Sequence, residues 1–367
     1  MNNYYHDAIS FDSLYKAMKR CCRNLRWKDS VTGYEYNGLR NTYYLRQSLL
    51  NDDYYILPYQ HFTIYEPKQR DIVATRFRDR QFQMSLCRSG LYSDITEHFI
   101  RDNSACQTGR GTDDTLRRLT AQLRRYYRKY GNTGWVLHCD IKKFFPSTKH
   151  SIAKQEVSKY IEDKEALFHV FQIIDSFDDG DAKGIGLGSQ VSQLIELSVL
   201  TYLDHYIREV LHPDVYVRYM DDYVIVHHNK EELKYILSEI QRIIEEFGFI
   251  LNSKTQIHPL RQGIKLMKWT FYITDTGKIL KKLAKSKLGK QRRKLKHLWY
   301  RECVGTIEPN KTQESLRSFL AHAEKGNTYQ QRRRMIKYFE KLTNQKYISK
   351  PSKIKKGDKN EVSEESD

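Results

Sequence analysis

The hydrophobic positions between residues 215 and 226 follow the pattern of two strands joined by a tight turn. The first run places apolar or aromatic side chains at alternate positions, Val215, Val217 and Tyr219. A second run, residues 224–226, consists of β-branched side chains. Alternation with a period of two and β-branching are typical of strands. We therefore predict a hairpin that carries two adjacent acids, Asp221 and Asp222, at its tip.

A second apolar run, residues 135–139, ends at a single acid, Asp140, and is followed by Phe144 and Phe145. This pattern predicts a strand and then a turn. An aspartate after a strand is often a cap or turn residue. If Asp140 instead faces the Asp221 hairpin across a sheet, the carboxylates form a site for hard divalent cations, which take oxygen ligands.

Helical periodicity predicts several further elements. Residues 231–247 read as an amphipathic helix and residues 194–210 as a long apolar helix. From residue 280 onward, leucines recur at helical spacing among many lysines and arginines. Residues 54–83 read as a strand, a turn, a second strand and the start of a helix.

Composition indicates the class of partner that the protein binds and the cellular compartment in which it works. The chain has 367 residues, with 63 Lys and Arg against 45 Asp and Glu, a formal net charge of +18. Such an excess favours a polyanionic partner through phosphate neutralisation. The six cysteines include no Cys-x-x-Cys pair, which argues against a zinc ribbon. No apolar run approaches the ~20 residues of a membrane span, and no signal-peptide core is present, so we expect a cytoplasmic protein without a membrane partner.

Several of these strings, taken in order, resemble prokaryotic reverse transcriptases. The Tyr-Met-Asp-Asp string at residues 219–222 resembles the palm signature of that family, and the Asp-x-x-x-Phe-Phe string at residues 140–145 resembles a second motif. A Pro-Lys followed by an Arg at residues 67–70 resembles the fingers segment, and residues 263–271 resemble the primer-grip hairpin. The resemblance covers about residues 50 to 300.

The resemblance assigns roles to individual residues. It implies two Mg²⁺ ions, with Mn²⁺ as a substitute, at Asp140, Ile141, Asp221 and Asp222. It implies nucleotide contacts from Lys68, Arg70, Ile141, Phe145, Leu187, Gly188 and Gln190. Phe145 corresponds to an aromatic gate that favours deoxynucleotides, and Leu266 and Trp269 to the primer grip. Lys254 corresponds to a residue that could protonate the leaving pyrophosphate, although an ordinary surface lysine fits the sequence equally well.

One string resembles that of a particular group of reverse transcriptases. Retroviral and group II intron enzymes carry Gln-Gly-x-x-x-Ser-Pro, whereas this chain has Leu-Gly-x-x-x-Ser-Gln at residues 187–193. That variant is typical of reverse transcriptases of diversity-generating retroelements. There, replacement of the Gln is associated with low fidelity, because losing a polar contact beside the sugar relaxes discrimination. Plain packing explains Leu187 equally well.

The resemblance implies an α+β right-hand polymerase with fingers, an antiparallel palm sheet and a helical thumb. The expected segments are an N-terminal extension at 1–50, fingers at 51–135, palm at 136–275 with finger insertions at 150–185, thumb at 276–345 and a disordered tail at 346–367. The implied reaction is RNA-templated addition of deoxynucleotides to a primer 3′-hydroxyl.

The implied partners are an RNA template, a DNA or RNA primer and deoxynucleoside triphosphates, with a structured non-coding RNA and a small helical accessory protein for a diversity-generating retroelement. Three alternatives stay open at this point. One is a phage-defence reverse transcriptase that copies a dedicated non-coding RNA, and another is a group II intron enzyme. The third is a catalytically silent RNA-binding protein, against which three intact acids argue.

Overall fold

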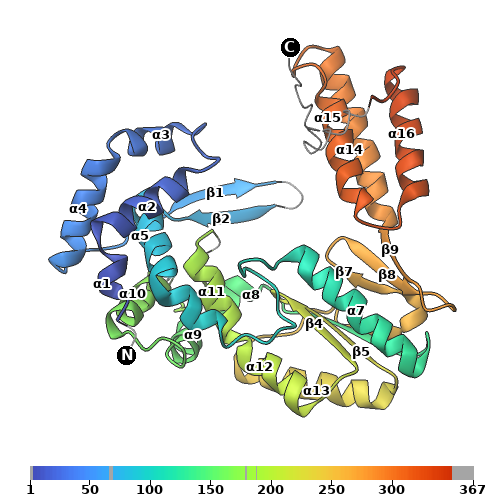
Figure 1. The fold of residues 1–367 in the computed structure, drawn as a ribbon, viewed down its shortest axis with the longest axis horizontal. Coiled ribbons are helices and arrows are strands. Elements are labelled where there is room, and N and C mark those ends of the chain that lie inside the picture. Colours follow the sequence, from blue (N-terminus) through green and yellow to red (C-terminus); the bar gives the residue numbers. More distant parts are fainter. Residues whose placement is uncertain (1–2, 66–68, 178–179, 187, 349–367) are drawn as a thin grey trace, which may run out of the picture. The chain divides into compact units, whose positions relative to one another are not determined.

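A computed structural model describes residues 3–65, 69–177, 180–186 and 188–348 (Figure 1). The chain divides into two compact units. The first comprises Met1–Met267 and Tyr272–Ile279, and the second comprises Lys268–Phe271 and Leu280–Asp367. Predicted Lys68, Leu187 and most of the predicted tail lie outside the described residues.

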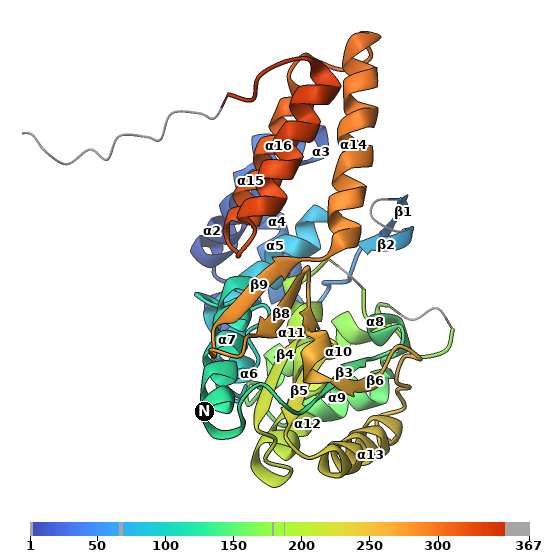
Figure 2. The same cartoon turned by 90° about the vertical axis from the view of Figure 1, so that its right-hand side faces the viewer.

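A four-stranded antiparallel sheet, in the order β4-β5-β3-β6, forms the middle of the first unit (Figure 2). Its strands are β3 (Trp135–Asp140), β4 (Val215–Tyr219), β5 (Asp222–His227) and β6 (Gln256–Pro259). The predicted hairpin is present as β4 and β5. Both strands are buried along nearly their whole length, Arg218 included, although their alternating pattern is typical of strands with one exposed face.

Helices account for this burial. The predicted amphipathic helix is α13 (Lys230–Glu246), which contacts β3 and β5 through its apolar stripe. That stripe consists of Leu233, Ile236, Ile240, Ile243 and Ile244, all buried. A second helix, α7 (Thr112–Tyr130), lies against β4, where the Gln122 side chain bonds both the N–H and the carbonyl of Tyr216 at 2.9 Å. The edge strand β4 is thereby covered, as buried backbone groups require.

The region that was predicted as one apolar helix at 194–210 is broken into three pieces. They are α11 (Gln190–Val199), α12 (Thr201–His205) and a π-helical turn (Tyr206–Val210). The break falls at Leu200, whose φ of −97° and ψ of 3° leave helical geometry. Apolar periodicity continues across such a break, because each piece still buries one face, so the sequence pattern did not reveal it.

The N-terminal part of the first unit is helical, with one hairpin. Its elements are α1 (Tyr5–Ala8), α2 (Phe11–Cys22), α3 (Asp29–Tyr36), α4 (Gly38–Leu50), β1 (Gln60–Ile64), β2 (Arg70–Ala74), α5 (Phe77–Leu86), a π-helical turn (Cys87–Leu91) and α6 (Tyr92–Thr96). The Ser10 hydroxyl accepts from Ser13 N and caps α2, a role for which serine is strongly preferred. The strand–turn–strand–helix order expected for residues 54–83 is confirmed.

Short helices follow β3 and lead toward α11. They are α8 (Phe144–Ser147), α9 (His150–Val157) and α10 (Lys164–Asp175). Asp163 caps α10 by accepting from the Glu165 and Ala166 N–H groups. Beyond β6, a 3₁₀ turn (Leu260–Gln262) leads into a three-stranded sheet of order β7-β8-β9, formed by β7 (Ile264–Leu266), β8 (Trp269–Ile273) and β9 (Ile279–Leu283).

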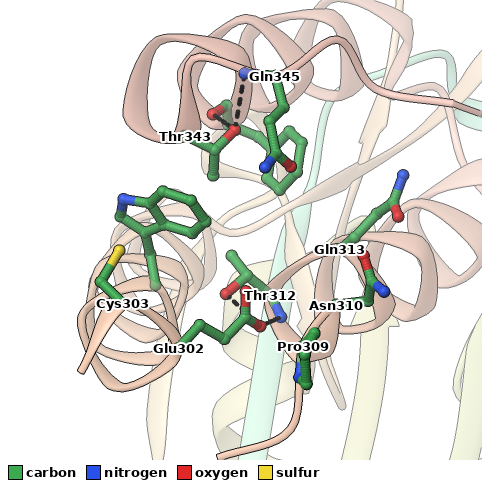
Figure 3. Close-up of a pocket in the computed structure, with 10 residues that line it drawn as sticks. Glu302, Cys303, Pro309, Asn310, Thr312, Gln313, Thr343 and Gln345 are labelled. Carbon is green, nitrogen blue, oxygen red and sulfur yellow. Dashed lines mark hydrogen bonds between the residues drawn. The ribbon is translucent and has the colours of Figure 1, made fainter. Parts of the chain in front are cut away.

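The second unit is mainly three helices, α14 (Lys285–Cys303), α15 (Lys311–Glu324) and α16 (Tyr329–Thr343). Its core contains Leu295, Leu316, Met335 and Phe339. The prediction that a helix begins near residue 280 is wrong for its first turn. Leu280 lies in β9, and the helix begins at Lys285. In a hollow between these helices, Glu302 accepts from the backbone N–H and hydroxyl of Thr312 and so caps α15 (Figure 3).

Candidate active site

The two adjacent acids lie at the tip of the β4–β5 hairpin. Tyr219 pairs with Asp222, so Met220 and Asp221 are the two residues of the connection. Met220 has φ +59°, the left-handed value that the primed hairpin turns require. A side chain there costs roughly 1–2 kcal/mol relative to ordinary backbone. The surrounding contacts must therefore hold this turn in place.

A buried ion pair behind the turn supplies that support. Arg218 is fully buried, and its Nε donates to Asp204 Oδ1 of α12 at 2.7 Å. Arg218 Nη1 also donates to the Met220 carbonyl at 2.9 Å. Tyr216 donates its hydroxyl proton to the same Asp204 carboxylate. The guanidinium therefore ties the left-handed residue of the turn to a helix. The sequence analysis missed this role, although an arginine in a strand of apolar residues was a visible signal.

Asp140 lies directly across the sheet from Asp222. The two residues are register partners in the antiparallel β3–β5 pair, at the end of the sheet where the turn lies. Directly opposed residues project from the same face with Cβ atoms about 5 Å apart. Asp221 immediately precedes Asp222 and lies in the turn. The structure therefore brings together the three acids that the sequence singled out, from two places about 80 residues apart in the chain.

These acids interact electrostatically. Burial, together with the smaller effect of the negative charges of Asp140 and Asp222, raises the pKa of Asp221 to about 6. Three neighbouring carboxylates are a donor set suited to hard divalent cations, which bind carboxylate oxygens and backbone carbonyls. Ile141 is 2% exposed and pairs with Leu251. Because its side chain is a hydrocarbon, only its backbone carbonyl can serve as a ligand. The residues present fit a magnesium site.

A histidine that the sequence analysis did not consider touches this cluster. His138 Nε2 lies 2.8 Å from Asp222 Oδ1. The hydrogen bond with Asp222 raises the pKa of His138, although partial burial of the ring opposes the change. His138 precedes Asp140 by two positions on β3, and side chains two apart on a strand share a face. That spacing was the signal in the sequence.

Phe145 and Lys254 lie on segments next to the end of β3. Phe145 is half-buried on α8, its ring centroid 5.7 Å from that of buried Phe144. The backbone of residues 250–252 pairs with that of residues 140–142, through Lys142 N to Ile250 O at 2.9 Å and Asn252 N to Asp140 O at 2.7 Å. Lys254 follows this segment in an exposed turn. The structure therefore places both residues beside the Asp140 strand, and their assigned roles stay predictions.

The loop before α11 holds the predicted glycine-rich contact. Gly188 has φ +120° and is exposed, with open space where a side chain would begin. The next residue, Ser189, caps α11 by accepting from the N–H groups of Val191 and Ser192. Its hydroxyl donates to Gln83 of α5. Gln190 is the first residue of α11 and half-buried, and the loop is thus anchored to α5 immediately beside it.

The remaining predicted residues are less informative. Arg70 begins β2 in the predicted hairpin, but its side chain and Lys68 are not among the described groups. Leu266 is buried at the end of β7. Trp269 is 3% exposed and packs against His322, with Lys281 Nζ 4.6 Å from its ring centroid. A primer-grip role for Trp269 stays a prediction. Because the Trp269 side chain is buried, any contact with a primer would be made by the groups around it.

A family model described as "Reverse transcriptase (RNA-dependent DNA polymerase)" matches residues 70–315. The chain belongs to the reverse transcriptase family. The description of that family names RNA-dependent DNA polymerase activity, which is a nucleotidyltransferase reaction. Among curated proteins, no significant match to the sequence is found. Within the described ranges, no helix combines the length and apolar character that crossing a membrane requires.

One solved structure supports the fold of this reverse transcriptase. Telomerase from Candida albicans, in complex with a TWJ fragment of telomeric RNA, gives a TM-score of 0.50 at 10% identity, covering 85% of this chain and 66% of that one. Two structures of apo telomerase from Candida tropicalis give TM-scores of 0.48 and 0.49 at 11% identity. They cover 61% and 78% of this chain, and 55% and 62% of theirs. The chain thus spans between about half and two thirds of these structures.

At such low identity the likeness concerns the fold alone. The mixed helix and sheet architecture, with its antiparallel sheet, is that of a right-hand polymerase, as expected from the sequence. The predicted boundaries between fingers, palm and thumb stay predictions. The observed division places the predicted fingers and, apart from Lys268–Phe271, the predicted palm in the first unit, and residues 280–345 of the predicted thumb in the second.

Proposed function

We propose that this reverse transcriptase adds deoxynucleotides to a primer 3′-hydroxyl on an RNA template at the Asp140, Asp221 and Asp222 cluster. The observation that carries the proposal is the register of β3 and β5, which sets Asp140 opposite Asp222 beside the turn residue Asp221. Asp140 and Asp221, with the Ile141 carbonyl, would hold two Mg²⁺ ions, and Asp222 would support them. When bound, the ions supply charge neutralisation for the triphosphate and lower the pKa of the attacking hydroxyl.

The protein groups around the cluster position the reactants. Arg218 keeps the Met220 turn rigid, so that Asp221 does not need to reorganise when a cation and a triphosphate arrive. Phe145 limits the space at the sugar. Lys254 donates a proton to the pyrophosphate as it leaves. Lys68 and Arg70 neutralise the triphosphate, for which arginine offers a fork and lysine a point charge.

Primer extension on poly(rA)/oligo(dT) with Mg²⁺ tests the proposal. We expect Asp140→Ala and Asp221→Ala each to lower extension by about a thousandfold or more, because charge stabilisation at a metal site is worth several kcal/mol. Asp12→Asn, which removes an exposed acid on α2, is the matched control and should extend normally. Full extension by the Asp221 variant would overturn the assignment.

The biological role that we propose is that of a diversity-generating retroelement enzyme, working with its own structured RNA and a small helical accessory protein in the cytoplasm. Support comes from the Leu-Gly-x-x-x-Ser-Gln string at 187–193 and from the net charge of +18, which suits RNA partners. A template and variable repeat pair beside the gene would be the expected genomic context. Leu187→Gln should lower misincorporation several-fold on a defined RNA template. An unchanged error spectrum would remove Leu187 from the argument.

A further inference from the structure

Three side chains of types that bind transition metals meet at the open end of the β4–β5 hairpin, the end opposite the Met220–Asp221 turn. Asp214 directly precedes β4, His227 is the last residue of β5 and His228 follows it. One possible ligand atom from each lies within 4.8 Å of the other two. No role in polymerisation has been given to any of the three.

The distances in this cluster are close to those of a bound metal. Asp214 Oδ2 lies 2.8 Å from His228 Nδ1 and 3.8 Å from His227 Nε2. Around tetrahedral zinc, ligand atoms at about 2.0–2.1 Å from the metal are roughly 3.3 Å from each other. Small side-chain rotations are therefore sufficient to admit an ion, and no backbone change is needed.

Neighbouring groups orient the two imidazoles. The other ring nitrogen of His227, Nδ1, lies 3.1 Å from the Asn229 carbonyl. Metal-bound histidines commonly donate that second N–H to a carbonyl. The Asn229 backbone nitrogen also lies 3.1 Å from Nδ1, so both tautomers of His227 find a partner. A metal bound at Nε2 would select the tautomer in which Nδ1 carries the proton and donates it to the Asn229 carbonyl. The ring of Tyr130 on α7 stacks on the ring of His228, with a centroid distance of 4.2 Å and an interplanar angle of 7°.

Burial and charge favour a cation here. The side chains of Asp214 and His227 are 14% and 12% exposed, whereas His228 is 45% exposed and leaves a path for an ion. Burial opposes ionisation of Asp214, but hydrogen bonds from His228 outweigh it and lower the pKa of that carboxyl. The carboxylate is therefore charged at neutral pH. Lys129, which lies over the Tyr130 ring, is the nearby competing cation.

We propose that Asp214, His227 and His228 bind one Zn²⁺ ion at a site separate from the magnesium cluster. Two imidazoles and one carboxylate suit zinc and related borderline metals, whereas magnesium prefers oxygen ligands alone. The ion joins the end of β5 to the residue before β4, so it holds the base of the hairpin whose tip carries Asp221. Through the Tyr130 stack it also links this base to α7. Its role is structural.

Zinc titration of the full-length protein after removal of metal with EDTA tests this site. The double variant Asp221→Asn with Asp222→Asn serves as the background, because it removes zinc binding to the catalytic carboxylates. We expect one Zn²⁺ per chain by calorimetry, and a visible Co²⁺ spectrum typical of nitrogen ligation when cobalt replaces zinc. His228→Ala and Asp214→Asn should each weaken binding by roughly tenfold or more.

His205 offers a matched control, because it is also partly exposed and its Nδ1 lies 2.6 Å from a carboxylate oxygen, that of Glu209. His205→Ala should leave the zinc affinity unchanged. Zinc should also raise the melting temperature of the background protein but not that of the same protein carrying His228→Ala. Equal zinc binding by the His228 and Asp214 variants, or less than one site in the background protein, would overturn the proposal. Neither result bears on polymerase activity.

Discussion

Replacing Asp221 with asparagine should stabilise the metal-free protein while it abolishes the activity. Burial, together with the charges of Asp140 and Asp222, raises the pKa of Asp221 from an ordinary value of 3.8 to about 6. Because the folded-state pKa is the higher one, ionisation of Asp221 destabilises the fold. The free energy of unfolding therefore falls as the pH rises from about 4 to about 6, and it stays lower above that. Asparagine cannot ionise and avoids this loss.

The magnitude follows from the difference between the two pKa values. At about 1.4 kcal/mol per pH unit, the difference corresponds to roughly 3 kcal/mol. Asp221 is only half-buried, so solvent screening reduces the effect, and we expect about 1–3 kcal/mol at pH 8. The pKa of His138 is also raised, so its stabilising contact with Asp222 is lost as the pH rises through that value. This second effect is common to wild type and variant and largely cancels between them.

Hydrogen–deuterium exchange of peptides from β4 and β5 measures this local stability. In EDTA at pH 8, Asp221→Asn should slow exchange roughly 5- to 100-fold relative to the wild type, and at pH 4 the two should be nearly equal. Added Mg²⁺ should slow exchange in the wild type but have little effect in the variant. Asp12→Asn controls for the general effect of removing an acid. Faster exchange in Asp221→Asn at pH 8 without metal would refute the reasoning.

Three other perturbations separate positioning from packing. His138→Ala should weaken the apparent affinity for Mn²⁺, measured by calorimetry, by about 10- to 100-fold because the Asp222 carboxylate loses its partner. His138→Asn should restore part of that affinity. Unchanged affinity in both variants would show that His138 only packs. Phe145→Val should admit ribonucleotides about tenfold more readily in single-nucleotide extension, and unaltered sugar selectivity would exclude a gate. Arg218→Met should lower the free energy of unfolding by about 3–5 kcal/mol because it leaves the Asp204 carboxylate buried without its positively charged partner. Combining it with Asp204→Leu should recover stability but not extension rate; recovery of both would show that the ion pair has no role in holding the turn.

Local pattern was sufficient for the elements that carry the site. The alternating and β-branched residues around Asp221 specified a hairpin, and the apolar stripe of residues 231–247 specified a helix that is observed as α13. Such elements depend on side-chain periodicity within a few residues, which the chain displays directly. The order of the motifs also indicated the family. The same local reasoning failed at Leu280, because a short apolar run is compatible with both a strand and the first turn of a helix.

The pairing of distant segments was decided only by the tertiary structure. Nothing near Asp140 in the sequence states that β3 lies beside β5 and in the register that opposes Asp222. Backbone hydrogen bonds between strands are the same for every residue type, so register is selected by the burial of whole faces and the connections around them. The Arg218 ion pair with Asp204 and the His138 contact with Asp222 follow from that pairing, as does the cluster at the base of the hairpin. The sequence by itself determined which acids are the candidates for the chemistry, and the packing of the sheet decided which residues hold them in place.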